Sequence, residues 1–395
     1  MTQINFTLDS EQIQDIISNS GANDLAKQML TTIFNQLMEK ERDAYINADN
    51  YSRVDERVSS RNGYYERNYT TRIGRLELVI PRTRDGEFSP SIFERYQRNE
   101  KALLSTMLEM YVQGVSTRKV SKVVEELCGA TVSKSFVSTL TAELDSIVTT
   151  FLNRSIERKY PFILSDVIYI KVREDRRVLS KAFHVILGIN DLGERELLSF
   201  SVSDTESYET WKGLYKNLIE RGLTGLKLII SDAHKGEVAA IREVFGGVAW
   251  QRCKVHFMRN VFDKLPRKNT ETIRDELKVL FKTNNIDIAR TLKNSICERY
   301  SENYGKMTDC LDEGFEDAFQ YCSIEETNYS RLKSTNMLER VNSEIRRRER
   351  VVRIFPNEQS AVRLIGAVLI DIHEDWQSST RQYIKFTEVT KKWLD

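Results

Sequence analysis

Residues 161–172 read PFILSDVIYIKV, a run of apolar and β-branched residues with Asp166 in its middle. A run of this kind is typical of a strand that is buried on both faces. A carboxylate in such surroundings is costly unless a partner balances its charge. A second apolar run, LKLIISDAHKG at residues 226–236, ends at Asp232. The two runs predict two core strands, each of which delivers one acid; the alternative for Asp232 is an ordinary turn or cap residue.

A third acid, Glu339, lies in STNMLERVNSEIRRR, a stretch that predicts a polar helix leading into arginines. Its apolar face is predicted to consist of Leu338, Val341 and Ile345, and Glu339, Asn342 and Arg346 follow an adjacent polar face. Glu339 could instead be a capping-box acid, because Thr335 and Asn336 precede it. Carboxylates on two strands and a helix, beside basic residues, predict divalent-metal chemistry on a phosphate backbone.

The segments around the two aspartates predict one α/β unit. Helices are expected at residues 206–221 and 236–245, a hairpin loop at 191–194, and strands at 162–172, 181–189, 196–202, 226–230 and 248–250. Three antiparallel strands followed by helix, parallel strand, helix and strand are the order of an RNase H-like core. In that topology the first and fourth strands are neighbours. Asp166 is therefore expected beside Asp232.

Changes in composition and hydrophobic periodicity along the chain predict six parts. The first three are a helical region (1–58), which is either a dimerisation element or a small bundle, a small basic β element (59–99) and a helix-turn-helix-like DNA-binding domain (100–150). The first part of the core (158–252) and an all-helical insertion (253–328) follow. The last is the second part of the core (329–395), which contains the Glu339 helix and a C-terminal helix at 359–376.

Basic residues gather in the small β element, in the helix-turn-helix-like domain and on the helix that carries Glu339. The β element has turn signals at Asn62-Gly63 and Asp85-Gly86 and a strand at 75–80, and Ser116 and Ser133 are expected to cap two helices of the helix-turn-helix. The residues expected to contact DNA are Arg61, Arg67, Arg72, Arg118, Lys119, Lys122, Ser133, Lys134, Ser135, Arg346, Arg347 and Arg348. The alternatives are a hairpin edge with solvated charges, a generic three-helix bundle and a solvated helix face.

The overall composition is that of a soluble globular protein. The chain has 395 residues, of which 30% are charged. Because its net charge is only +1, the local positive patches indicate that a polyanion is bound at defined places. No apolar run is long enough to span a membrane. The start lacks the pattern of a signal peptide, and five scattered cysteines fit a reducing compartment.

The stretch Cys253-Lys254-Val255-His256 contains two soft ligands, but a second pair at zinc-site spacing is missing. A packing or hydrogen-bonding role near the active site is the preferred interpretation. His234 could contact DNA or form a local structural bond. We expect His234, Cys253, His256 and Asn342 to support the site, and interpret His184 and His373 as structural.

Several separated segments resemble the Mutator-like transposases of bacterial insertion sequences. They are RNGYYER, PRTRDGEFSP, SDVIYIKVR, ISDAHKG, WQRCKVHFMRN, RLKSTNMLERVNSEIRRRERVVRIFPN and RLIGAVLIDIHEDW, which occur in this order over nearly the whole chain. The resemblance implies a DDE triad on an RNase H-like fold with a helical insertion before the last acid. Asp166, Asp232 and Glu339 occupy the triad positions, and Cys253 and His256 match the Cys-x-x-His signature of the family.

The resemblance also implies the reaction. Such enzymes bind terminal inverted repeats as a homodimer, hydrolyse a phosphodiester to free a 3′-OH, and use that hydroxyl to attack another strand, through a circular joined-end intermediate. Two Mg²⁺ (or Mn²⁺) ions per active site and a nucleoid-associated, cytoplasmic location in a bacterium are expected, without membrane contact. The alternatives are an RNase H-like nuclease without strand transfer and a non-enzymatic DNA-binding regulator.

Overall fold

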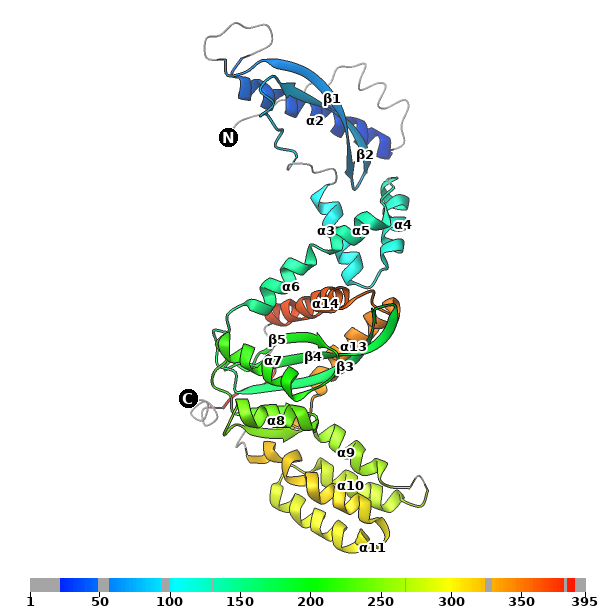
Figure 1. The fold of residues 1–395 in the computed structure, drawn as a ribbon, viewed down its shortest axis with the longest axis vertical. Helices are drawn as coiled ribbons and strands as arrows, with labels where there is room; N and C mark the ends of the chain where they lie inside the picture. Colours follow the sequence, from blue (N-terminus) through cyan, green and yellow to red (C-terminus); the bar gives the residue numbers. More distant parts are fainter. Residues whose placement is uncertain are drawn as a thin grey trace. The chain divides into compact units, whose positions relative to one another are not determined.

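A computed structural model describes residues 22–48, 57–93, 100–129, 131–266, 268–323, 329–379 and 382–387 (Figure 1). The chain divides into two compact units, Met1–Ala142 and Glu143–Asp395. The finer division into six parts stays a prediction, and the first 21 residues of the helical region predicted at 1–58 lie outside the described residues. None of the helices in these described ranges is long and apolar enough to cross a membrane.

The first unit begins with helix α2 (Ala22–Ile46) and a hairpin of strands β1 (Arg61–Thr71) and β2 (Gly74–Thr83). Met38 of α2 packs with Leu76 and Leu78 of β2 in a small core. The hairpin is longer than the strand predicted at 75–80, and Asn62-Gly63 is not its turn. Gly63 instead has a φ of +70° at a register shift within β1, the left-handed conformation that a bulge requires.

Three helices complete this unit: α3 (Lys101–Val112), α4 (Thr117–Cys128) and α5 (Lys134–Thr141). They share a core that includes Met107, Val124 and Val137. The predicted caps are confirmed, since Ser116 accepts a hydrogen bond from the backbone N–H of Lys119 and Ser133 from that of Phe136. The three packed helices thus follow from cap residues and periodic apolar positions, and their helix-turn-helix character stays a prediction.

The second unit is a mixed α/β structure, as predicted, built on a five-stranded sheet with the order β5-β4-β3-β6-β7. Its strands are β3 (Phe162–Glu174), β4 (Arg177–Ile189), β5 (Arg195–Ser203), β6 (Leu228–Ser231) and β7 (Ala249–Arg252). Strands β3, β4 and β5 pair antiparallel, whereas β6 lies parallel to β3 and to β7. The predicted neighbourhood of the first and fourth strands is confirmed.

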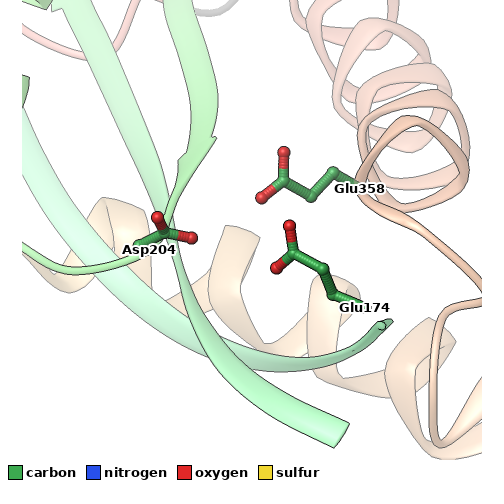
Figure 2. A group of neighbouring side chains, drawn as sticks. All are labelled: Glu174, Asp204 and Glu358. Carbon is green, nitrogen blue, oxygen red and sulfur yellow. The ribbon is translucent and has the colours of Figure 1, made fainter. Parts of the chain in front are cut away.

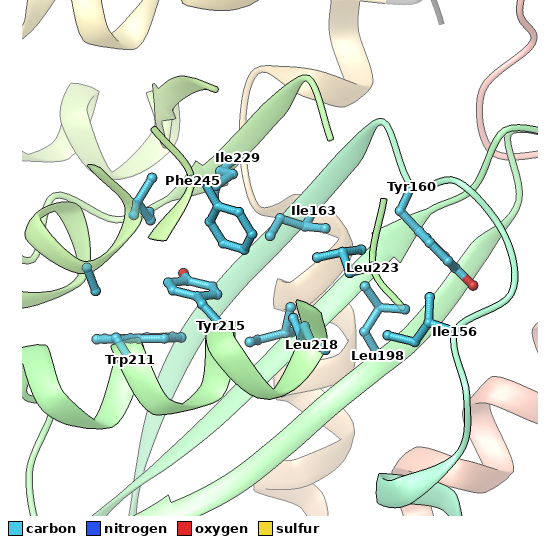
Figure 3. Packing of buried hydrophobic residues seen from close by; sticks show 13 residues of the cluster. Ile156, Tyr160, Ile163, Leu198, Trp211, Tyr215, Leu218, Leu223, Ile229 and Phe245 are labelled. Atoms are coloured by element: carbon cyan, nitrogen blue, oxygen red, sulfur yellow. The ribbon is translucent and has the colours of Figure 1, made fainter. Parts of the chain in front are cut away.

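Helices α7 (Tyr208–Glu220) and α8 (Lys235–Val244) cover one face of this sheet. Their main buried side chains, Trp211, Tyr215 and Ile241, pack against Ile163 of β3 and Ile229 of β6 (Figure 3). Ile163, Ser165 and Val167 alternate along β3, so they share this face, whereas Asp166 faces the opposite side. The alternation of the strand therefore separates a packing face from the face that carries the acid.

The remaining elements of this unit are helical. Helix α6 (Leu144–Asn153) packs with α14 (Glu358–Ser378), which also contacts β5. Between β7 and residue 323 the described part of the chain forms α9 (Lys254–Asp263), α10 (Glu271–Lys282), α11 (Ile286–Ala318) and the 3-10 turn η1 (Gln320–Ser323). Helices α12 (Tyr329–Leu332) and α13 (Asn336–Val352) follow, and α13 contacts β3. Glu339 is thereby carried to the sheet.

Candidate active site

Asp166 and Asp232 come from neighbouring parallel strands. The pairing of β3 with β6 runs from Phe162 opposite Leu228 to Leu164 opposite Ile230. Continued by two residues, the same register brings Asp166 of β3 level with Asp232, the residue directly after β6. Sequence reasoning predicted this juxtaposition from the order of the strands alone.

Asp166 is half-buried and strongly hydrogen-bonded. One carboxylate oxygen accepts from the backbone N–H of Val167 at 2.9 Å, and the other accepts from the side-chain amide of Asn342 at 2.7 Å. Burial raises the pKa of the Asp166 carboxyl, and these two hydrogen bonds offset only part of the rise. The site thus withdraws one carboxylate from water, where a counter-charge has most effect.

Asn342 joins the helix of Glu339 to the strand of Asp166. Glu339 precedes Asn342 by three residues on α13, so the two side chains share a helix face. Thr335 is the N-cap of α13, and its side chain makes no capping bond, which places Glu339 outside a capping box. Glu339 itself is exposed. The helix therefore presents an exposed carboxylate one turn before the amide that holds Asp166.

Asp166, Asp232 and Glu339 do not form a closed ligand cluster. Among the described residues, the single group of three acidic or thiol or imidazole ligands within 4.8 Å of one another is Glu174, Asp204 and Glu358 (Figure 2). We do not regard this group as a metal site, because the ammonium of Lys181 lies 2.5–2.6 Å from an oxygen of each carboxylate. A lysine whose side chain is 2% exposed already supplies the positive charge there.

Cys253 links the segments that carry Asp232 and Glu339. Its N–H donates to the carbonyl of Ser231 at 2.7 Å, and its sulfur lies 3.3 Å from the hydroxyl of Thr335, the first residue before α13. Cys253 is buried, and it also accepts from the N–H of Thr335 at 3.5 Å. The thiol thus fixes the start of the Glu339 helix next to the end of β6.

His256, in the first turn of α9, lies between this thiol and the two aspartates. Its Nδ1 is 3.9 Å from a carboxylate oxygen of Asp232. Interaction with Cys253 raises the pKa of His256 to about 9 against the effect of its burial, and the Asp232 and Asp166 carboxylates add to the rise. Burial opposes ionisation of the Cys253 thiol, but its interactions with His256 and Thr335 outweigh this and lower its pKa. The pair therefore favours a positive imidazole facing the acids.

His234 faces a further acid that sequence reasoning missed. The Nδ1 of His234, the N-cap residue of α8, lies 3.3 Å from Glu206, which also accepts from the indole N–H of Trp211 at 3.2 Å. Burial raises the pKa of Glu206, and the Asp232 and Asp166 carboxylates contribute to the rise. Glu206 lies in a polar loop segment, SDTES, that carries no distinguishing pattern.

The arginines of α13 differ in exposure. Arg346 and Arg347 are exposed and pair within their own helix, with Glu349 at 3.8 Å and Glu344 at 3.0 Å. Arg348 is instead 3% exposed and lies 3.6 Å from Glu344. This burial does not suit the predicted DNA contact, and the helical period explains it, because Arg348 follows Val341 by seven residues on the apolar side.

The basic residues of the first unit also divide into two groups. Arg61 donates to Asp43 at 2.7 Å and to the carbonyl of Ala48 at 2.8 Å, and Arg67 covers the ring of Phe93, so both tie parts of the unit together. The other predicted DNA contacts of this unit are exposed, namely Arg72, Arg118, Lys119, Lys122, Ser133, Lys134 and Ser135. We retain this exposed group, with Arg346 and Arg347, as candidate DNA contacts.

Comparisons with known proteins show the family of the chain. A family model described as "Transposase, Mutator family" matches residues 1–379. The chain is 56% identical to the transposase for insertion sequence element IS256 in transposon Tn4001 from Staphylococcus aureus, over 98% of this chain and 100% of that protein. It is 40% identical to the transposase for insertion sequence element ISRM5 from Rhizobium meliloti, over 98% and 97% of the two chains, and 33% identical to that for IS1081 from Mycobacterium tuberculosis, over 97% and 93%. The chain belongs to the Mutator family of transposases.

Proposed function

We propose that this transposase cuts and joins DNA with a DDE triad of Asp166, Asp232 and Glu339 on an RNase H-like core. The observation that carries the proposal is the register of β3 and β6, which sets Asp166 beside Asp232, together with the bond from Asn342 that brings the helix of Glu339 to the same strand. The sheet order and the helical segment that precedes Glu339 support the RNase H-like assignment.

The donor set fits divalent cations. Mg²⁺ and Mn²⁺ take hard carboxylate oxygens from a few protein groups, with water and phosphate completing the shell. Asp166 and Asp232 offer such oxygens from adjacent strands, and Glu339 would complete the set by a side-chain movement on α13. In this proposal Asp166 would contribute to holding both ions, Asp232 to holding one and Glu339 to holding the other. When bound, the two ions supply Lewis-acid stabilisation to the attacking and leaving oxygens.

The side chains around the triad have supporting roles. Asn342 orients the Asp166 carboxylate, and the imidazole of His256 holds Asp232 between the strand end and α9. Cys253 keeps the start of α13 against β6, and Glu206 holds His234, two residues after Asp232. Arg346 lies two turns beyond Glu339 and would neutralise a backbone phosphate. These groups position the scissile phosphodiester without forming a covalent bond to it.

The reaction would proceed in two chemically similar steps. Water attacks a phosphodiester at the element end and cuts that strand into two pieces. One piece ends in a 3′-OH and the other begins with a 5′-phosphate. The 3′-OH then attacks a second phosphodiester and forms a new bond as the 3′ oxygen of that strand leaves. We propose a circular joined-end intermediate, a homodimer that brings two ends together, and a cytoplasmic, nucleoid-associated location, following the family resemblance.

Recognition of the inverted repeats is assigned to the first unit. Ser133, Lys134 and Ser135 are exposed at the start of α5, where small polar and basic side chains can enter a major groove, and Arg118, Lys119 and Lys122 are exposed on α4. Deleting the first unit should abolish end-specific binding. Specific recognition of an end by the remaining Glu143–Asp395 fragment would relocate the reader.

Purified protein incubated with labelled inverted-repeat DNA and Mg²⁺ tests the function. A transposase yields joined strands in addition to cut ends. Cutting without joining would identify a nuclease, and a mobility shift without cutting would identify a regulator. Either of these results would overturn the proposal.

A further inference from the structure

A buried carboxyl lies behind the proposed site, on the opposite face of β3. Glu237 belongs to the first turn of α8 and is 1% exposed. The same oxygen, Oε1, accepts two hydrogen bonds, one from the hydroxyl of Ser165 at 2.5 Å and one from the hydroxyl of Tyr215 at 2.8 Å. The two hydroxyl oxygens are 3.1 Å apart. All three side chains are buried, so the triangle is shielded from water.

The triangle joins the two segments that carry the aspartates. Ser165 precedes Asp166 directly on β3, and α8 begins three residues after Asp232. Tyr215 holds the third corner rigidly, because its ring stacks on Trp211 at 5.5 Å and meets Phe245 edge-on at 5.3 Å (Figure 3). Movement of α8 relative to β3 would therefore break directional bonds as well as apolar contacts.

Stability alone does not account for a carboxyl at this position. The surroundings are apolar, and burial raises the pKa of the Glu237 carboxyl to about 8. Apolar side chains of similar volume often stabilise a core at least as well as a buried polar group does. What the carboxyl adds is one acceptor for two donors from different elements, which fixes distance and direction.

We propose that Glu237 is a positioning residue for the metal-binding carboxylates: through Ser165 and Tyr215 it fixes β3 relative to α8, and thereby the separation of Asp166 from Asp232. The inference rests on the proposed function, since it assumes that these two aspartates hold divalent ions. Glu237 touches neither the ions nor the DNA.

Calorimetric titration of the full-length protein with Mn²⁺ tests this role, with cleavage of labelled end DNA as a second readout. Glu237→Leu should weaken Mn²⁺ binding about 10-fold, at the lower end of the effect of groups that orient metal ligands, and leave DNA affinity unchanged. Glu237→Gln should bind Mn²⁺ as the wild type does, because the amide oxygen still accepts from both hydroxyls.

Glu243→Gln is the matched control. Glu243 lies on the same helix and is bonded to Tyr208 and Lys212 of α7, but it is at the surface and makes no bond to β3 in the described part of the chain. It should bind Mn²⁺ as the wild type does. If Glu237→Leu fails to fold, Ser165→Ala decides the question, because it cuts the link to β3 and keeps the Glu237–Tyr215 bond.

The outcomes separate the two proposals. A Glu237→Leu protein, or in its place a Ser165→Ala protein, that melts earlier and yet binds Mn²⁺ with wild-type affinity would overturn the positioning role and leave the function intact. Wild-type protein whose Mn²⁺ binding is unaffected by Asp166→Asn would instead overturn the metal site itself, and the positioning role with it.

Discussion

Replacing Asn342 by alanine removes one defined bond from the proposed site. The amide of Asn342 donates to Asp166 at 2.7 Å, and both side chains are half-buried. A hydrogen bond to a charged group contributes about 1.5–3 kcal/mol, and partial exposure favours the lower end of this range. If the bond orients Asp166 in the transition state, about 1.5 kcal/mol corresponds to a rate that is roughly tenfold lower.

Single-turnover cleavage of labelled end DNA at fixed Mg²⁺ measures this effect. Ser343→Ala is the control, because Ser343 is the next residue of α13, is exposed, and donates to the Arg340 carbonyl of its own helix at 2.7 Å. We expect Asn342→Ala to cleave about tenfold more slowly with unchanged DNA affinity. A rate equal to that of Ser343→Ala would refute the orienting role. A matching loss of DNA affinity would make Asn342 a DNA contact instead.

Three further results are expected. Asp166→Asn and Glu339→Gln should bind end DNA normally in a mobility-shift assay and lose both cleavage and joining; substantial turnover would remove that residue from the site. Replacing Arg346 and Arg347 together by glutamine should reduce the slope of log affinity against log salt by about 2, roughly one per phosphate, and an unchanged slope would leave them as a solvated helix face. Burial raises the pKa of Glu237 to about 8, so the native state keeps a proton that the unfolded chain releases near pH 4.5, and stability falls as pH rises between these values. Glu237→Gln should reduce the slope of the free energy of unfolding against pH in this window by up to about 1.4 kcal/mol per pH unit, as denaturant titrations at several pH values measure, and an unchanged slope would show that Glu237 titrates normally.

The placement of Asp166 beside Asp232 could be predicted because it depends on strand order. Three apolar strand runs, then one helical stretch and a fourth run that ends at Asp232, leave few ways to pair, and the parallel contact of β3 with β6 is the one observed. The caps at Ser116 and Ser133 were also predictable, since they depend on a local bond between a side chain and the backbone.

Features that depend on packing could not be read from local sequence. Asn62-Gly63 has the composition of a turn, but pairing with β2 continues past it and converts Gly63 into a bulge residue. Arg348 looks like its two neighbours in sequence and differs from them only in the direction it faces. The contacts of Glu206 with His234 and of Glu237 with Ser165 could not be read from local sequence, because these partners are distant in the chain and the fold brings them together.

The central claim is that three carboxylates from two strands and a helix converge on divalent ions when DNA is bound. Anomalous scattering from Mn²⁺ in crystals of the protein with its end DNA tests this most directly. We predict ions bonded to Asp166, Asp232 and Glu339, with the side chain of Glu339 turned toward the sheet. Ions bonded elsewhere, with these three carboxylates free of metal at the bound DNA, would contradict the account.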